Sequence, residues 1–241
     1  MQSLHSGLDS VDDGFMGADT QPPEFAGDRK SGQSFLGPAE RRFIDRWVTR
    51  IPAPIEGWHL TMLTLVWSFG TVFFAYLSLE NRWWIWAMSA LVFLQWLTDS
   101  FDGSLGKHRK AGLIKWGFFM DHLLDLIFAG SIVIGYYFLA PEGTAFMFLV
   151  LMLVTCASMA VSFLSFAATN QFQIAHYGIG PTEIRIGWIA LNTFVFFAGE
   201  GVFWWGLPLV IVLNIAALVL LAYQTQKTLW ELDKANNVDA N

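Results

Sequence analysis

Four aspartates lie close together in residues 99–125 (DSFDGSLGKHRKAGLIKWGFFMDHLLD). Asp99 and Asp102 are three residues apart, and Asp121 and Asp125 are four apart. Either spacing places two side chains on one face of a helix. Carboxylate oxygens suit Mg²⁺ or Mn²⁺, whereas Zn²⁺ favours nitrogen and sulfur ligands. The four acids therefore predict a site for Mg²⁺ or Mn²⁺ with two ions about 3.5–4 Å apart, able to neutralise a pyrophosphate.

The second pair of aspartates lies inside an apolar stretch, residues 112–139. If a helix begins near Gly112, its rise places Asp125 about 20 Å along it. An aspartate at the centre of a bilayer costs roughly 2.5–3.5 kcal/mol on insertion scales. A buried Lys or Arg would offset this cost, but the stretch has neither beyond Trp116. We therefore expect bound cations to compensate the carboxylates.

Other polar and small residues near the acids could contact a phosphate-bearing substrate. Glycine allows a ligand to approach the backbone closely, and Lys or Arg binds phosphate. Lys107 and Arg109 could equally serve membrane orientation alone, and Glu183, in residues 180–186 (GPTEIRI), could favour the start of a helix. The candidate substrate-binding residues are Gly103, Gly106, Lys107, Arg109, Gly117, Glu183 and Arg185.

The composition of the chain indicates a membrane protein. Of its 241 residues, 54% are hydrophobic and 14% are charged, compared with about 25% charged residues in soluble domains. About 20 apolar residues in a helix cross the hydrocarbon core of a bilayer. We therefore predict an all-α integral membrane protein with six transmembrane helices. The apolar stretches are 58–79, 83–101, 112–139, 144–167, 183–199 and 203–224.

The distribution of Lys and Arg predicts the orientation of these helices. Basic residues precede the first stretch, separate the second from the third, begin the fifth and follow the sixth, whereas Arg82 falls in a loop on the other side. Because cytoplasmic loops carry an excess of Lys and Arg, we expect both termini and the acidic window to face the cytoplasm. The net charge of −6 does not suggest a nucleic-acid partner.

Four segments are expected along the chain. Residues 1–38 resemble a disordered acidic tail, because they have too little apolar surface to offset the entropy of ordering. Residues 39–56 are predicted to form an amphipathic interfacial helix, since apolar residues recur there every three or four positions between arginines. Residues 57–226 would form the six-helix domain, and residues 227–241 a cytoplasmic C-terminal tail.

The spacing of the acids resembles the signature of the CDP-alcohol phosphotransferase (CDP-alcohol phosphatidyltransferase) family. That signature is D-x-x-D-G-x-x-A-R, usually seven or eight residues, then G-x-x-x-D-x-x-x-D. Here Gly106 and Lys107 replace the alanine and the arginine, and nine residues separate Lys107 from Gly117. The residues that fall on the pattern are Asp99, Asp102, Gly103, Gly117, Asp121 and Asp125.

This resemblance implies an enzyme of phospholipid biosynthesis. It would transfer a phosphatidyl or phospho-amino-alcohol group from a CDP-alcohol donor to an alcohol or lipid acceptor, with release of CMP. The resemblance also implies a homodimer among membrane lipids, with Asp99, Asp102 and Asp121 as metal ligands. An ion- or proton-coupled transporter is the alternative, because intramembrane acids also mark ion pathways. The clustering of all four acids in one cytoplasm-facing window favours the enzyme.

Two residues are candidates for the base that deprotonates the acceptor hydroxyl. Asp125 lies one turn beyond Asp121 on the same helix face, which suits a base or a metal ligand. His122 points about 100° around the helix from Asp121, toward a neighbouring helix, but an unperturbed histidine titrates near neutrality. The D-H-x-x-D arrangement and the GPTEIRI segment are similar to the choline/ethanolamine phosphotransferase branch, where this histidine is a candidate base. Geometry favours Asp125, and basicity favours His122.

Overall fold

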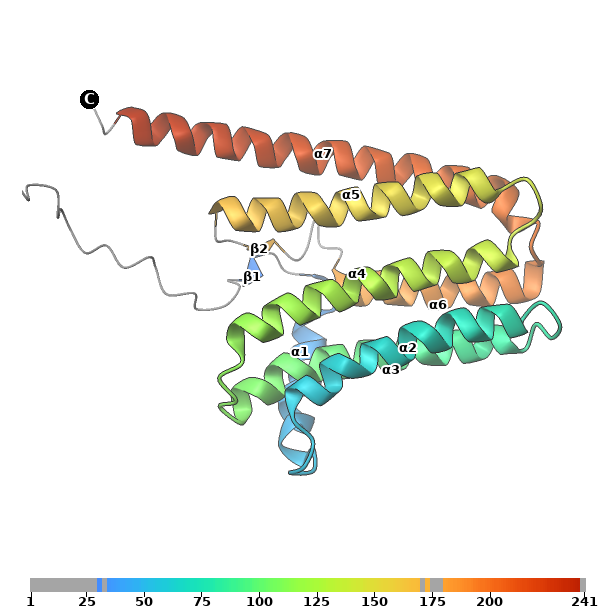
Figure 1. Ribbon diagram of the computed structural model, residues 1–241, viewed down its shortest axis with the longest axis horizontal. Coiled ribbons are helices and arrows are strands. Elements are labelled where there is room, and N and C mark those ends of the chain that lie inside the picture. The colour runs from blue at the N-terminus through green and yellow to red at the C-terminus, as the bar shows by residue number, and fades with distance from the viewer. Residues whose placement is uncertain (1–29, 32–33, 170–171, 174–179, 239–241) are drawn as a thin grey trace, which may run out of the picture.

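The computed structural model describes residues 30–31, 34–169, 172–173 and 180–238, and these are almost entirely helical. A short helix, α1 (Gly37–Trp47), and a 3₁₀ turn, η1 (Val48–Arg50), precede the main bundle. Strands β1 (Lys30–Ser31) and β2 (Phe172–Gln173) form one two-residue parallel pair. The all-α prediction is therefore confirmed. The six long helices (Figure 1) are α2 (Gly57–Leu77), α3 (Trp84–His108), α4 (Ile114–Leu139), α5 (Ala145–Thr169), α6 (Pro181–Ala198) and α7 (Val202–Val238).

Helix α2 packs against both α3 and α4, while α6 packs on α3, and α5 packs on α4 and α7. The buried face of α2 consists of small and hydroxyl-bearing side chains, which allow neighbouring helices to approach closely. Three of these hydroxyls donate hydrogen bonds to carbonyls four residues earlier in the same helix. The buried residues are Gly57, Thr61, Thr64, Ser68, Thr71 and Ala75.

A polar contact inside the apolar core joins three helices. The Tyr136 hydroxyl on α4 donates to Asn192 Oδ1 on α6 at 2.9 Å. The same asparagine donates through Nδ2 to Ser89 Oγ on α3 at 3.0 Å. Because unsatisfied polar groups are costly in this environment, these bonds favour one arrangement of α3, α4 and α6.

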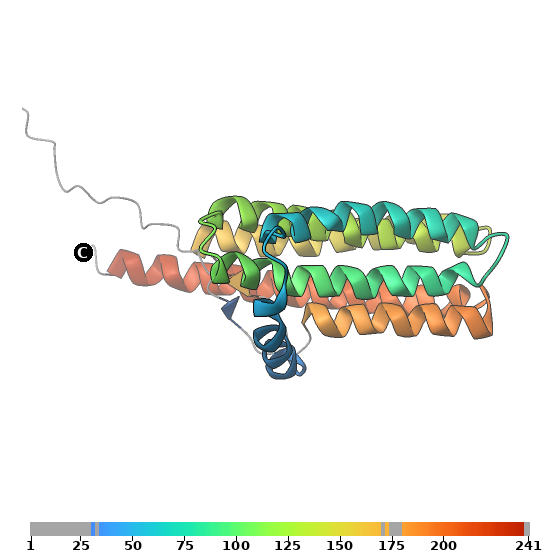
Figure 2. The ribbon, with the colours of Figure 1, turned by 90° about the horizontal axis from the view of Figure 1, so that it is seen from below.

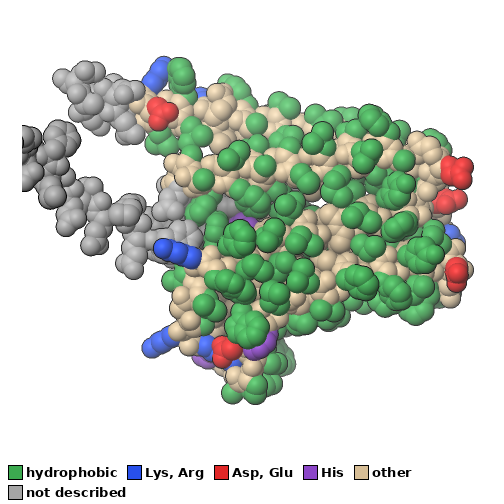
Figure 3. All heavy atoms as spheres, in the orientation of Figure 1, with side chains coloured by type: hydrophobic (Ala, Val, Ile, Leu, Met, Phe, Trp, Pro, Cys, Tyr) green, Lys and Arg blue, Asp and Glu red, His purple; other side chains and the backbone are tan. Residues whose placement is uncertain are grey.

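Helices α2, α4, α5 and α7 are each long and apolar enough to cross a membrane, by length and composition. Hydrophobic side chains cover the long face of the bundle that Figure 3 shows, and the charged side chains visible there lie toward its two ends. Helices α3 and α6 run beside the other four (Figure 2). Their composition is more polar, so they do not meet the same criterion for crossing a membrane. The prediction of six spans therefore remains a prediction.

The predicted interfacial segment, residues 39–56, is helical over a shorter range than expected. Helix α1 ends at Trp47 and η1 at Arg50, just before two prolines, which cannot donate to a helix and restrict the preceding residue. Ile44 and Val48 are buried against α3 at the end of the bundle. A membrane-interfacial position for α1 stays a prediction.

Two helices are longer than the apolar stretches that predicted them. Helix α3 continues to His108 rather than ending near residue 101, and α7 continues to Val238, so the predicted tail at 227–241 begins as helix. Hydropathy marks the length of hydrocarbon that a helix crosses, whereas polar residues can continue the same helix into water. The predicted acidic tail, 1–38, lies mainly outside the described residues.

Candidate active site

Three of the four aspartates come together at one end of the bundle. Asp99 projects from α3, and Asp121 and Asp125 project from α4; all three are half-buried. One carboxylate oxygen from each lies within 4.8 Å of the others. Three carboxylate oxygens at this separation can bind one hard cation, which fits Mg²⁺ or Mn²⁺. We call Asp99, Asp121 and Asp125 the acidic cluster.

Asp102 lies outside this cluster and contacts α2. Its Oδ2 accepts a hydrogen bond from the Thr61 hydroxyl at 2.6 Å, and its Oδ1 accepts one from the backbone N–H of Gly103. Residues three apart on a helix are offset by about 60° around its axis, so Asp99 and Asp102 can face different neighbours. The predicted set of four acids thus consists of three that share one space and one that contacts α2.

Arg185 on α6 supplies a positive charge to the acidic cluster. Its Nη2 donates to Asp99 Oδ2 at 2.8 Å and to Asp125 Oδ1 at 3.2 Å, and the side chain is buried. The expectation that the deep aspartates lack a basic partner is therefore wrong, because the partner comes from a different helix. Three carboxylates against one guanidinium still leave two formal negative charges, which suits a divalent cation.

Gln95 connects these charged groups, although its sequence position alone did not suggest a role. It is fully buried on α3, accepts from Arg185 Nε at 2.6 Å through Oε1, and donates to Asp125 Oδ1 at 3.3 Å through Nε2. A polar residue four positions before Asp99, inside an apolar run, lies on the same helix face. That spacing is the sequence signal that could have identified it.

The fold and the comparison with protein families agree on the class of this protein. A model of the CDP-alcohol phosphatidyltransferase family matches residues 59–224, which include the acidic cluster and Arg185. The chain belongs to the CDP-alcohol phosphatidyltransferase family. The comparison with curated proteins found no match, and neither did the comparison with solved structures. Membership of the family, together with four apolar helices, identifies a membrane transferase, and gives the transporter alternative no support.

In this phosphatidyltransferase-family protein, the ring of His122 packs against α5 beside the acidic cluster. Its Nδ1–H donates to the Phe118 carbonyl at 2.7 Å, and its ring packs against Phe118 and against Phe163 of α5. Nδ1 lies 3.9 Å from Asp121 Oδ2. Asp125, by contrast, faces α3 and α6. The two candidate bases therefore occupy different surroundings.

The three glycines in the segment that resembles the family signature do not serve close helix packing in the transferase. Apart from its own chain neighbours and helix backbone, a Cβ atom added at Gly103, Gly106 or Gly117 would meet no atom of the described residues within 4 Å. Gly57, which the signature does not include, is different, because a Cβ there would lie 2.5 Å from the Asp102 carbonyl oxygen. Gly57 is therefore required where α2 meets α3, whereas Gly103, Gly106 and Gly117 leave open space beside the acids.

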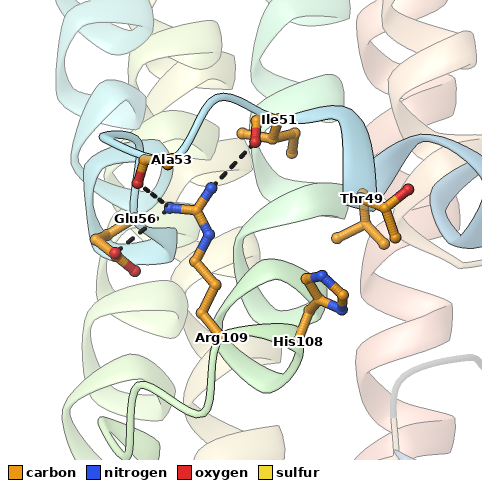
Figure 4. Close-up of a pocket in the computed structure, with 7 residues that line it drawn as sticks. Thr49, Ile51, Ala53, Glu56, His108 and Arg109 are labelled. Atoms are coloured by element: carbon orange, nitrogen blue, oxygen red, sulfur yellow. Dashed lines mark hydrogen bonds and ion pairs between the residues drawn. The ribbon is translucent and has the colours of Figure 1, made fainter.

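Arg109, a predicted substrate contact, is engaged by the segment between η1 and α2. Its Nη1 donates to the carbonyls of Ala53 and Ile55, and Nη2 donates to those of Ile51 and Pro52. Figure 4 shows the contacts of Arg109 with Ile51, Ala53 and Glu56 beside a pocket of about 320 Å³. Arg109 therefore ties this segment to the end of α3, whereas Lys107, on the last turn of α3, is exposed.

Glu183, also predicted to contact substrate, holds backbone at the start of α6. Its Oε2 accepts from the Gly180 N–H at 2.9 Å, and its Oε1 accepts from the Leu36 N–H at 2.8 Å. A carboxylate in the first turn of a helix satisfies N–H groups that have no partner within the helix. These contacts give Glu183 the capping role that was its alternative interpretation.

Proposed function

We propose that the protein transfers a phospho-alcohol group from a CDP-alcohol to an acceptor alcohol in phospholipid biosynthesis. The acceptor oxygen forms a bond to the phosphorus that carries the donor alcohol, the bond from that phosphorus to CMP breaks, and the hydroxyl proton passes to a protein base. The observation that carries this proposal is the convergence of three carboxylates from two helices, within 4.8 Å, inside the region that matches the family.

Asp99, Asp121 and Asp125 would hold Mg²⁺ or Mn²⁺, with Asp102 as the predicted fourth ligand and two ions as the predicted number. Bound divalent ions neutralise pyrophosphate charge and stabilise the charge that develops on the attacked phosphate. The open space beside Gly103, Gly106 and Gly117 supports the approach of a ligand to the cluster.

The surroundings of the two candidate bases support different roles. Asp125 lies among Asp99, Gln95 and Arg185, which suits a metal ligand. In a neutral His122 imidazole, donation from Nδ1–H to a carbonyl leaves Nε2 as the nitrogen that accepts a proton, which suits a base. We therefore propose His122 as the base and Asp125 as a ligand, which reverses the preference that helix geometry alone suggested.

Arg185 and Lys107 would act differently on the donor. Arg185 is buried and already donates to two carboxylates, which supports a role in holding the cluster. Lys107 is exposed on the last turn of α3 and remains the proposed phosphate contact on that helix. We propose that Arg109 acts on the donor indirectly, by holding the segment between η1 and α2 at the end of α3.

We also propose that α3 and α6 cross the membrane with α2, α4, α5 and α7, giving six spans with the acidic cluster at the cytoplasmic end. The basic residues of α1 and of the α3 C-terminus support this orientation. A homodimer in the membrane is proposed from the family resemblance.

The donor and acceptor can be assigned by one matrix of reactions with the purified protein in detergent. CDP-diacylglycerol with small polar alcohols forms one arm, and CDP-choline or CDP-ethanolamine with diacylglycerol forms the other, each with Mg²⁺ or Mn²⁺. The GPTEIRI segment and His122 lead us to expect lipid product in the second arm. Product only in the first arm would reverse that assignment, and no product in either arm would contradict the proposed function.

A further inference from the structure

A glutamate on α1 joins two helices that carry residues of the acidic cluster and its counter-charge. Glu40 accepts a hydrogen bond from the Ser100 hydroxyl of α3 through Oε1, at 2.7 Å. It accepts a second from the Thr182 hydroxyl of α6 through Oε2, also at 2.7 Å. The Trp96 indole N–H of α3 donates to the same Thr182 hydroxyl at 3.2 Å. One carboxylate therefore bridges α3 and α6.

The contact between α1 and α6 is made from both sides. While Glu40 of α1 binds Thr182 of α6, Glu183 of α6 binds the backbone N–H of Leu36, the residue before α1. Phe43 of α1 also packs against the Trp96 ring, with centroids 6.1 Å apart. These contacts fix the first turn of α6 on α1, and fix α1 on α3.

Both hydroxyls that bind Glu40 are next to residues of the candidate active site. Ser100 follows Asp99 directly, and Thr182 precedes Arg185 by three residues on the same helix. The bond from Arg185 to Asp99 spans the same two helices, α6 and α3. A movement of the first turn of α6 away from α3 would therefore lengthen this bond.

We propose that Glu40 is a positioning residue, which fixes α6 against α3 and so maintains the contact between Arg185 and Asp99. Glu40 does not touch the reacting atoms, and it acts through Ser100 and Thr182. The catalytic consequence rests on the proposed function, whereas the placement of α6 does not.

The test compares Glu40→Ala and Glu40→Gln with Asp45→Ala, which removes an exposed acid from the same helix. The Gln side chain keeps one acceptor oxygen for one hydroxyl, and its amide N–H can donate to the oxygen of the other hydroxyl. Ala removes both contacts. Spin labels on cysteines at the exposed positions His108 and Ile186, after replacement of Cys156, report the distance between the ends of α3 and α6 without requiring activity. We expect a broader distance distribution for Glu40→Ala, and wild-type distributions for Glu40→Gln and Asp45→Ala.

Turnover provides the second measurement. Loss of a residue that orients a metal ligand typically costs about 10–100-fold, and we expect kcat of Glu40→Ala to fall in that range while Glu40→Gln retains most activity. Thr182→Val should reduce kcat similarly, and the double variant with Glu40→Ala should lose little more, because both changes remove one shared contact.

An unchanged distance distribution in Glu40→Ala would overturn the proposal, as would kcat values for Glu40→Ala and Asp45→Ala that do not differ. If Glu40→Ala does not fold, Thr182→Val must show the broadened distribution for the proposal to stand. A broadened distribution in a protein whose wild type releases no CMP would support the positioning role and contradict the proposed transferase reaction.

Discussion

Arg185 and Asp99 form an ion pair of 2.8 Å between residues that lie 86 positions apart in the sequence. Arg185 is buried, and the exposed fraction of its side chain is 7%, against 19% for Asp99. Charges removed from water in this way are stable only when they are paired and hydrogen-bonded. The pair therefore ties α6 to α3 at the point where the carboxylates converge.

Replacing Arg185 with methionine should destabilise the protein and make its stability depend on divalent cations. Removing one partner of a buried ion pair typically costs 3–5 kcal/mol, because the remaining charge is left uncompensated. We expect Arg185→Met to unfold at a lower temperature than wild type, and added Mg²⁺ to restore part of the loss. Arg185→Lys serves as a control that keeps the charge. Equal thermal stability of wild type and Arg185→Met, with and without Mg²⁺, would contradict this role.

Two glycine substitutions should distinguish a glycine needed for helix packing from a glycine that lets the ligand approach. Gly57→Ala places a methyl group 2.5 Å from the Asp102 carbonyl oxygen, and overpacking of this kind typically costs about 1–3 kcal/mol. Gly103→Ala meets open space and should leave thermal stability equal or higher, since alanine favours helix, while lowering the affinity for the CDP-alcohol. Thermal unfolding and KM measurements check both variants. A stable Gly57→Ala protein would show that α2 and α3 do not need this close approach.

His122→Ala and Asp125→Asn should affect turnover in different ways. A general base contributes about 10²–10⁴-fold, so His122→Ala should lose kcat in that range and still bind metal and donor normally. Asp125→Asn should raise the Mg²⁺ concentration needed for half-maximal activity, because it replaces an anionic carboxylate of the cluster with a neutral amide. Turnover and metal affinity must be measured separately. If Asp125→Asn loses turnover at saturating metal while His122→Ala remains active, the two roles are exchanged.

The proposed topology can be tested by labelling of single cysteines. With Cys156 replaced, a cysteine at Lys107 should react only when the reagent reaches the cytoplasmic side. A cysteine at Glu142, in the loop between α4 and α5, should react from the opposite side. Labelling of the two positions from the same side would contradict a crossing of the membrane by α4, the one long helix between them.

The class of fold and the residues of the cluster could be predicted because they depend on local sequence. Apolar stretches located the six long helices, and helical spacing placed Asp121 and Asp125 on one face. The ends of α3 and α7 could not be placed in the same way, because polar residues continue a helix beyond the hydrocarbon.

Contacts between helices depend on how the helices pack, and the sequence of one helix does not specify its neighbours. Arg185 was a candidate phosphate contact, and its contacts with Gln95 and with carboxylates on α3 and α4 were not predicted. Asp102 was predicted to join the other acids, and its additional contact with Thr61 on α2 was not predicted. Gln95 was not identified, although its spacing from Asp99 offered a signal, and the role of Glu40 arises only when α1 packs against α3 and α6.

The release of CMP tests the central claim most directly, that the acidic cluster is the active site of a CDP-alcohol transferase. Purified wild-type protein, given a CDP-alcohol and an acceptor with Mg²⁺ or Mn²⁺, should form CMP and lipid product in equal amounts. Asp99→Asn and Asp121→Asn should each reduce this activity by more than about 100-fold, because loss of a metal ligand costs more than loss of a residue that only orients one. Asp45→Asn should keep the activity. Wild-type CMP formation by folded Asp99→Asn and Asp121→Asn proteins, or equal activity without divalent cations, would contradict the account.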